Sequence, residues 1–193
     1  MALTEPRPAR RSQSAHQAIL AAAAEVAAER GYFGATIEEI AARAGTGKQT
    51  IYRWWRAKPF LFVELYGVLV PAEAMRVDSG SLRGDLEALL TRLLGFYRDT
   101  PAATVLSGLI AEAQSDPAVA EAFDAEIVQA RRPILMEPLE RGRTRGEIAE
   151  HDMAFAADLF TAAVWHRLLL RGERPEPEFI GRLVDRLLGD SQS

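Results

Sequence analysis

Four side chains between positions 48 and 53 carry hydrogen-bonding groups suited to nucleic acid. Gln49 can pair with the two edge positions of adenine, and Arg53 can pair with the two acceptors of guanine. Lys48 and Tyr52 carry donors that suit phosphate oxygens, which fix register without reading sequence. The chemistry of this segment is therefore base reading combined with phosphate binding.

A helix over this segment would separate the two kinds of side chain. With about 3.6 residues per turn, Ile51 and Trp55 share one edge, while Gln49 and Arg53 lie on the opposite face. Trp54 lies to one side, where we expect it to pack against a DNA backbone. Simpler alternatives exist, because Gln49 can merely close a capping box and Arg53 can be an ordinary solvated charge.

Two capping patterns place this segment in a pair of short helices. Thr36 and Glu39 match T-x-x-E, which satisfies backbone donors at a helix start, so we expect a helix from there to Gly45. Thr46 and Gln49 repeat the pattern as T-x-x-Q and predict another short helix. Two short helices joined by a turn with glycine form a helix-turn-helix, whose second helix enters the major groove.

The charge of the chain is unevenly distributed. The net charge is −4, but positions 1–59 hold nine basic and five acidic residues, and the remainder holds fourteen basic and twenty-two acidic ones. A basic head is typical of nucleic-acid binding. Ahead of a first helix expected over Ser14–Arg30 and ended by Gly31, we expect Arg7, Arg10 and Arg11 to form an arm that is disordered without DNA.

Composition limits the function classes. The 193 residues include no cysteine, which excludes disulfides, thiolate metal ligands and cysteine nucleophiles. The three histidines are scattered, and no acid–base pair or nucleophile pattern is present, so we expect no metal, no cofactor and no catalytic residue. No run approaches the roughly 20 uncharged apolar residues of a membrane span, so we expect a cytoplasmic protein without a membrane partner.

The stretch from Ile19 to Leu61 resembles the DNA-binding domain of the TetR/AcrR family of bacterial transcriptional regulators. The resemblance rests on AERGYFGATIEEIAARAGTGKQTIYRWWRAKPFL and covers about a quarter of the chain. Two departures are Trp54, where many members carry histidine, and Pro59, which replaces a common acidic residue. The resemblance implies DNA contacts at Thr36, Thr46, Lys48, Gln49, Tyr52, Arg53, Trp54 and Lys58, and Thr50 joins them beside the exposed face.

Beyond this stretch the sequence predicts an all-α body, for a total of about nine helices. We expect a DNA-binding domain over residues 1–57 and a ligand-binding and dimerisation domain over 58–193. Pro133 and Pro138 predict a kink or a break in a long helix over 120–141, and the pattern leaves open which. The other body helices are expected over 58–69, 81–98, 102–114, 153–171 and 176–189.

Two further sites are expected in the body. Aromatic and flexible side chains of the middle helices can line a ligand pocket; the candidates are Tyr66, Phe96, Tyr97, Phe123, Phe155 and Trp165, with Met75 and Met136. The resemblance implies that the last two helices form a four-helix dimer interface, unless their apolar stripes merely fill the subunit core. The candidates for that interface are Ala162, Phe179, Ile180, Leu183, Val184 and Leu187, with small neighbours at Ala156, Ala157 and Ala163.

These features favour a ligand-responsive regulator, in the form of a repressor. A homodimer would bind a palindromic double-stranded DNA operator, and a small, partly apolar effector would release it. An architectural DNA-binding protein with weak sequence preference is the alternative, against which the acidic body argues. A helical enzyme is a third possibility, and no catalytic pattern supports it.

Overall fold

The computed structural model describes residues 8–148, 153–172 and 176–189, and over these ranges it consists of helices and turns without a strand. This confirms the all-α prediction, while Arg7 of the expected basic arm lies outside the described residues. The short helix α5 had no signal in the sequence pattern. The elements are α1 (Pro8–Gly34), α2 (Ile37–Arg43), α3 (Lys48–Trp54), α4 (Lys58–Leu69), α5 (Ala72–Met75), α6 (Leu82–Asp99), α7 (Ala102–Ala113), α8 (Pro117–Phe123), the π-helical segment η1 (Asp124–Gln129), α9 (Arg132–Thr144), α10 (Met153–Trp165), the π-helical segment η2 (His166–Leu170) and α11 (Pro177–Gly189).

Helix α1 begins earlier than its sequence pattern indicates and bends at Gly31. It starts at Pro8, so Arg10 and Arg11 belong to its first turns and not to an extended arm. Gly31 has φ 71° and ψ 175°, which ends the regular helix at the predicted residue. Glycine adopts this left-handed φ without a Cβ clash. The bend directs Tyr32 into the core, where its side chain is 1% exposed.

The two short helices differ in how they start. Thr36 accepts a hydrogen bond from the backbone N–H of Glu39 at 3.2 Å, which confirms the first predicted cap. At α3, Gly47 is the N-cap residue and no side chain caps the helix. The second capping box was therefore wrong, because the helix starts one residue after the position where Thr46 and Gln49 could bond reciprocally.

The segment expected as one helix over 120–141 is divided in two. Helix α8 continues into η1, the chain turns at Ala130 and Arg131, and α9 then begins. Pro133 lies in the first turn of α9, where its missing N–H leaves no hydrogen bond unmade. Pro138 lies inside α9, which continues past it. The structure thus has a break before Pro133 and an uninterrupted helix at Pro138.

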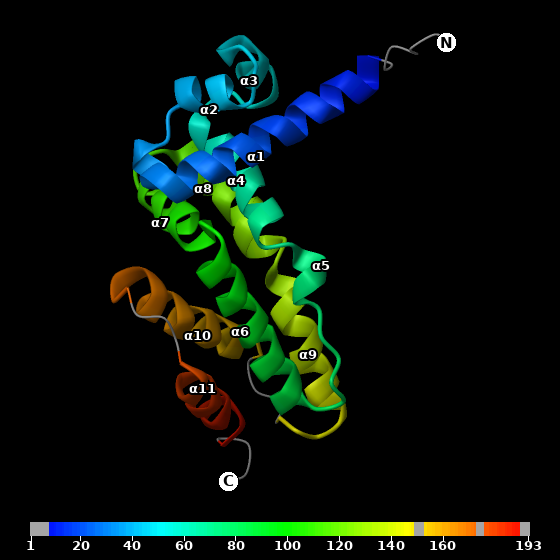
Figure 1. Cartoon of the computed structure of the whole chain (residues 1–193). Helices are drawn as coiled ribbons and strands as arrows, with labels where there is room; N and C mark the ends of the chain where they lie inside the picture. The colour runs from blue at the N-terminus through cyan, green and yellow to red at the C-terminus, as the bar shows by residue number, and fades with distance from the viewer. Residues whose placement is uncertain (1–7, 149–152, 173–175, 190–193) are drawn as a thin grey trace.

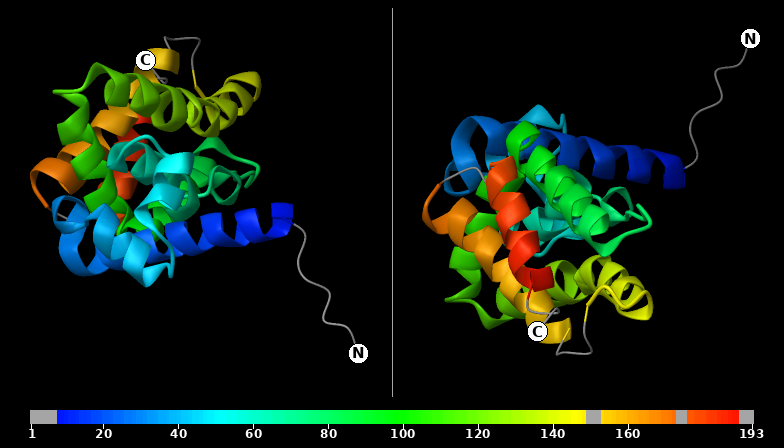
Figure 2. Two further views of the ribbon diagram at one scale, coloured as in Figure 1. Left: turned by 90° about the horizontal axis from the view of Figure 1, so that it is seen from above. Right: turned by 90° about the horizontal axis from the view of Figure 1, so that it is seen from below.

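The helices form a head and a body (Figure 1). Helices α1 to α3 make the head, and the N-terminal half of α1 projects away from the other helices in both further views (Figure 2). Helix α4 connects the two parts, packing against α1 on one side and against α7, α8 and η1 on the other. In the body, α6 packs against α9 and α11, and α10 packs against α9 and α11. The head therefore meets the body through α1, α4 and α7.

One charged residue of the described chain is buried in the core of the body. Asp85 is 0% exposed and accepts hydrogen bonds from the backbone N–H of Ser79 at 2.6 Å and from Nη2 of Arg141 at 2.9 Å. Burial alone would raise the pKa of this carboxyl, but the donors on Ser79 and the charge of Arg141 outweigh it and lower the pKa of Asp85. This cluster joins α6 to α9.

Candidate nucleic-acid interface and ligand cavity

The outer face of α3 presents the side chains predicted to read DNA bases. Gln49, Tyr52 and Arg53 are exposed, while Ile51 and Trp55 are buried against the head. Within the part of the chain that the structure describes, neither Gln49 nor Arg53 has a hydrogen-bond or ion-pair partner. Their amide and guanidinium groups are therefore available to another molecule.

A polar cluster that the sequence pattern did not reveal fixes the end of α3. Nε2 of His16 in α1 lies 2.9 Å from Oε1 of Glu64 in α4, and Nε1 of Trp55 donates a hydrogen bond to the second oxygen of Glu64 at 2.8 Å. The His16 ring stacks on Trp55 with ring centroids 4.8 Å apart and meets the edge of Trp54 at the same distance. Helices α1 and α4 thus hold the end of α3 in place.

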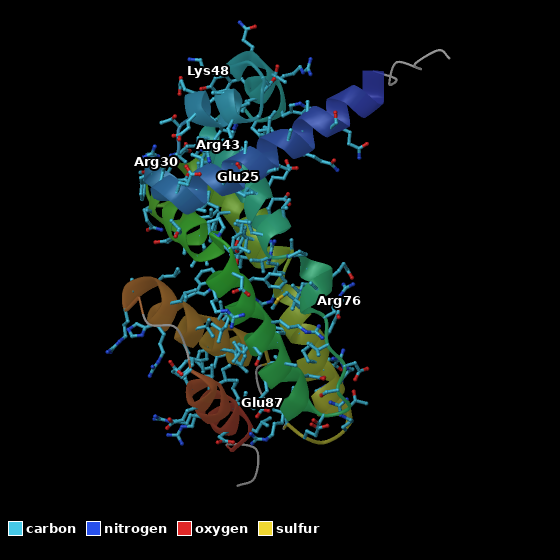
Figure 3. The ribbon with its side chains drawn as sticks, in the orientation of Figure 1. Glu25, Arg30, Arg43, Lys48, Arg76 and Glu87 are labelled. Atoms are coloured by element: carbon cyan, nitrogen blue, oxygen red, sulfur yellow. The ribbon has the colours of Figure 1, made fainter. Side chains whose placement is uncertain are left out.

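Helix α2 is tied to α1 by ion pairs (Figure 3). Arg43 donates two hydrogen bonds to Glu29, at 2.5 and 2.8 Å, and lies 3.8 Å from Glu25 and 3.6 Å from Glu39. The bidentate geometry makes this pair more directional than a single surface contact. The angle between α1 and the helix-turn-helix is therefore set by side chains on both elements.

Lys48, a predicted phosphate contact, already has a partner. Its ammonium lies 2.7 Å from Oε1 of Glu38 in α2. The hydrogen bond from Lys48 lowers the pKa of Glu38, and the same bond raises the pKa of Lys48. Both side chains are more than half exposed, so the pair can open toward solvent.

The remaining predicted contacts occupy different surroundings. Thr36 is exposed at the start of α2, and Trp54 is 43% exposed at the end of α3. Thr46, just before α3, and Thr50, within α3, are half-buried. Lys58 lies elsewhere. Its ammonium donates to the carbonyl oxygens of Tyr32 at 3.0 Å and Ala35 at 3.4 Å and lies 4.4 Å from the centre of the Tyr32 ring.

This geometry gives Lys58 a structural role at the end of α1. Three of its contacts are to the segment after Gly31, and burial lowers the pKa of the Lys58 amine. The carbonyls at a helix end attract a cation because they have no intrahelical partner. The phosphate contact predicted for Lys58 therefore competes with this role.

A cavity of about 360 Å³ lies inside the body. Its walls come from α4, α5, α6, η1, α9 and α10, and they are mostly aliphatic and aromatic. Such a lining with few polar groups is typical of a small-molecule site. Of the predicted pocket residues, Tyr66, Tyr97 and Trp165 line it, as does Met75.

The other predicted pocket residues lie outside this cavity. Phe123 meets the Trp165 ring edge to face with ring centroids 6.2 Å apart, and neither Phe123 nor the half-buried Phe96 lines the cavity. Phe155 is 59% exposed on α10, and Met136 lines a separate surface hollow. Residue type alone could not show which of these side chains face the cavity, because the side that a residue faces depends on how its helix is rotated.

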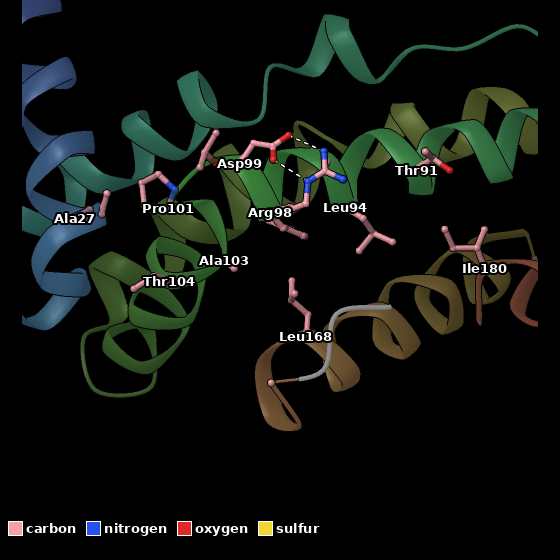
Figure 4. A pocket seen from close by; sticks show the side chains of 15 residues that line it. Ala27, Thr91, Leu94, Arg98, Asp99, Pro101, Ala103, Thr104, Leu168 and Ile180 are labelled. Atoms are coloured by element: carbon pink, nitrogen blue, oxygen red, sulfur yellow. Dashed lines mark hydrogen bonds and ion pairs between the residues drawn. The ribbon is translucent and has the colours of Figure 1, made fainter. Parts of the chain in front are cut away.

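A second, larger hollow of about 660 Å³ lies where head and body meet (Figure 4). It is lined by Ala27 of α1, Thr104 of α7 and Leu168 of η2, among others. Its lining includes Arg98 and Asp99, whose Nε and Oδ1 atoms form an ion pair 2.7 Å apart. The smaller cavity has the more apolar walls, which are typical of a small-molecule site, and we take it as the candidate ligand site.

Comparisons with known proteins match both parts of the chain. Residues 19–65 match the family model described as bacterial regulatory proteins of the tetR family, and residues 76–187 match the tetracyclin repressor-like C-terminal domain. The DNA-binding transcriptional repressor TetR of Mycobacteroides abscessus is 31% identical over 182 residues, covering 92% of this chain and 94% of the relative. The chain belongs to the TetR family.

Other members agree with this assignment. The uncharacterized HTH-type transcriptional regulator YdeS of Bacillus subtilis is 31% identical over 175 residues, covering 90% of this chain and 88% of its own. The crystal structure of the TetR family transcription regulator SCO0332 matches with a TM-score of 0.76 and 31% identity, covering 91% of this chain and 97% of that one. The protein is thus a TetR-family transcriptional regulator and not an enzyme.

A TetR-family regulator acts as a dimer, and α10 has an exposed apolar face. Phe155, Leu159 and Leu170 are 59%, 51% and 79% exposed, and their spacing places them along one side of α10 and η2. Residues 153–170 are also long and apolar enough to cross a membrane, with a mean hydropathy of 1.3 and 17% of the segment buried. Asp158 and Arg167 interrupt this segment, and a single such helix is weak support for a membrane span.

The predicted interface residues divide between surface and core. Ile180 and Val184 of α11 are buried in the subunit, whereas Phe179, Leu183 and Leu187 are half-buried. Ala162 of α10 is exposed and also contributes to the cavity wall. One apolar stripe of α11 thus fills the subunit core and the other is half-buried at the surface, where the dimer interface stays a prediction.

Proposed function

We propose that this TetR-family protein is a repressor that binds a palindromic operator as a homodimer in the bacterial cytoplasm. A small, partly apolar effector in the 360 Å³ cavity releases it from DNA. Effector and operator then oppose each other reciprocally, since each changes the affinity for the other by the same factor.

The observation that carries this proposal is the outer face of α3. Arg53 and Gln49 are exposed side by side on a helix that α1 and α4 hold in place, and both lack partners in the described chain. Lys48, Tyr52, Thr36 and the neighbouring threonines surround them with phosphate-binding groups. We propose Gln49 and Arg53 as base-reading residues and these neighbours, with Trp54, as backbone contacts.

The dimer is proposed through the exposed face of α10 and η2, with the half-buried stripe of α11. Two copies joined there by a two-fold axis would bury Phe155, Leu159 and Leu170. A two-fold protein fits an operator with two half-sites about one helical turn apart. We propose that the boundary between the two domains lies between residues 57 and 58. Helix α4 begins there and connects the two parts, packing on both.

The test measures binding of the purified protein to the DNA upstream of its own gene and to scrambled DNA of the same composition, at a fixed salt concentration. Wild type is compared with Arg53→Ala. Loss of one bidentate base contact should weaken operator binding by about 1–3 kcal/mol and relax the preference for the upstream sequence. Arg83→Ala, on the far end of the body, removes the same charge without touching α3 and serves as control.

The outcomes distinguish a repressor from an architectural DNA-binding protein. Nanomolar, sequence-preferring binding that the Arg53 variant loses and the Arg83 variant keeps would support the repressor. Weak binding to both DNAs with a steep salt dependence would instead indicate an architectural role and contradict self-regulation.

A further inference from the structure

Resting on the proposed effector cavity, we infer that the effector is a compact organic acid, with an apolar body and one carboxylate that pairs with Arg131. Arg131 follows η1 and lines the cavity beside Tyr66 and Tyr97.

Arg131 lies among mostly apolar side chains and forms no ion pair within 4 Å in the described chain, although the nearby charge of Glu126 acts to raise its pKa. Its Nη1 donates to the backbone carbonyl of Glu126 at 2.5 Å, its Nη2 donates to that of Val70 at 3.4 Å, and its guanidinium carbon lies 4.9 Å from the centre of the Tyr66 ring. Its Nε is buried and has no acceptor in the described chain. A buried donor without a partner costs free energy, so the chain itself leaves the hydrogen-bonding capacity of this guanidinium partly unfilled.

The two tyrosines leave a second donor available. The hydroxyl oxygens of Tyr66 and Tyr97 lie 2.8 Å apart, and both side chains are buried. Two hydroxyls hold two protons, and their mutual hydrogen bond uses one of them. Burial raises the pKa of both tyrosines, so both keep their protons at neutral pH. The spare capacity of the pair includes a donor, like that of Arg131.

The charges around the cavity leave one cation unpaired. The charged lining residues are Arg131, Arg132 and Asp158. Arg132 lies 3.4 Å from Asp158, so these two neutralise each other. Burial lowers the pKa of Arg131 more than the charge of Glu126 raises it, yet an arginine stays protonated in proteins, so Arg131 is the charged lining residue that no lining carboxylate faces. A carboxylate supplies both the negative charge and the acceptors.

The cavity volume limits the rest of the ligand. At about 360 Å³ it lies near the lower end of the range of small-molecule sites, roughly 300–1,000 Å³. Its remaining walls are aliphatic and aromatic, including Leu89, Leu93, Ile134 and Trp165. The occupant is therefore a compact apolar group joined to the acid, and a cationic molecule is disfavoured because Arg131, Arg132 and Asp158 together carry a net positive charge.

The test compares two pairs of ligands of matched shape by isothermal titration calorimetry on the full-length protein. One pair is decanoate and decan-1-ol, and the other is 2-naphthoate and 2-naphthalenemethanol. We expect at least one acid to bind, with an affinity at least ten-fold above that of its alcohol. Arg131→Met should remove most of this difference while leaving the affinity for the alcohol within about two-fold, which shows that the cavity is intact.

Two further variants guard against misfolding and general charge effects. Tyr97→Phe keeps the ring and removes one hydroxyl, so it should reduce acid binding with less risk to the fold. Arg92→Met is the matched control, because Arg92 also donates to backbone carbonyls, those of Ala74 and Arg76, but lies outside the cavity. It should leave the ratio of acid to alcohol affinity unchanged.

Three results would overturn the inference: an alcohol that binds as well as its acid, an acid affinity that Arg131→Met leaves unchanged, or no binding of any of the four compounds. Calorimetry requires no DNA, so these results are independent of operator binding. If an acid binds as expected but operator affinity does not fall in its presence, the ligand inference stands and the release mechanism of the proposed function fails.

Discussion

At the residue scale, the ion pair between Lys48 and Glu38 places a negative charge beside the surface proposed to meet phosphates. Their side-chain atoms lie 2.7 Å apart and both are exposed, so the pair adds little to folding stability. Glu38→Gln should therefore tighten operator binding several-fold at low salt, because it frees Lys48 and removes repulsion of the DNA. Fluorescence anisotropy at two salt concentrations would measure this, and the gain should shrink at the higher one.

The control for this change is Glu87→Gln in α6. Glu87 pairs with Arg83 at 3.3 Å, far from α3, and its substitution alters the net charge by the same amount (Figure 3). Equal affinities of the two variants for the operator would show that only the total charge matters, and would remove Lys48 from the phosphate-binding set.

Asp85 makes a prediction about stability and pH. Asp85→Asn removes the charge that Arg141 faces at 2.9 Å, so it should lower the free energy of unfolding at pH 7 by about 3 kcal/mol. The pKa of Asp85 is lower in the folded protein than its ordinary value of about 3.9, so its stabilising contribution is present above that value. The contribution is lost as the pH falls through the folded pKa.

Urea unfolding of wild type and Asp85→Asn at several pH values between 7 and 3 would check this prediction. The difference in the free energy of unfolding between the two proteins should be constant near neutral pH and become smaller in acid. Glu121→Gln, an exposed acid on α8, is the control and should differ little from wild type throughout. If the difference in the free energy of unfolding between wild type and Asp85→Asn grew larger in acid, this would contradict the direction of the pKa shift.

At the scale of elements, the contact between α1 and α7 depends on one missing side chain. A Cβ added to Gly108 would lie 2.1 Å from Cγ of Tyr32, which is fully buried. Gly108→Ala should therefore force the two helices apart and lower the free energy of unfolding by about 1–3 kcal/mol, although alanine favours a helix.

Gly95→Ala in α6 is the matched substitution for this test. A Cβ there would meet nothing within 4 Å, so the variant should gain up to about 1 kcal/mol from helix propensity. The midpoint temperature of thermal unfolding should fall below that of wild type for Gly108→Ala and rise above it for Gly95→Ala. A Gly108→Ala protein as stable as wild type would mean that Tyr32 has room to move.

How much of the fold followed from the sequence depends on the range of the interactions involved. Gly31 and Thr36 act on their own backbone, so the end of α1 and the start of α2 were predicted correctly. The start of α3 was predicted one residue early, because two alternative caps, Thr46 and Gly47, stand next to each other. The break before Pro133 stayed ambiguous, since a proline is tolerated in a first turn and can also end a helix.

The candidate sites show the same limit. The exposed face of α3 was predictable because it needs only helical periodicity within one element. The partners of Lys48 and Lys58 and the lining of the cavity depend on how separate helices are rotated and packed. Arg131 had no signal as a cavity residue, because in the sequence it is one of two adjacent arginines before a proline, and only the fold pairs Arg132 with Asp158.

At the scale of the whole molecule, the function proposed here requires two copies. One copy presents a single α3, and two half-sites bound together gain affinity through effective concentration, commonly by a factor of about 10² to 10⁴. The exposed apolar side of α10 and η2 offers the surface for this pairing. A charge at its centre would be buried without a partner in the dimer but exposed to water in the monomer.

Leu159→Glu should therefore convert the protein to a folded monomer and weaken operator binding by about 100-fold or more, because each half-site would then be bound alone. Sedimentation velocity would report the mass, circular dichroism the retained helices, and anisotropy the affinity. Val68→Glu is the control, since Val68 is a 54% exposed apolar residue on α4 and lies outside the proposed interface. A Leu159→Glu protein that sediments as a dimer would place the two-fold axis elsewhere, and the exposed face of α10 would then need a different partner.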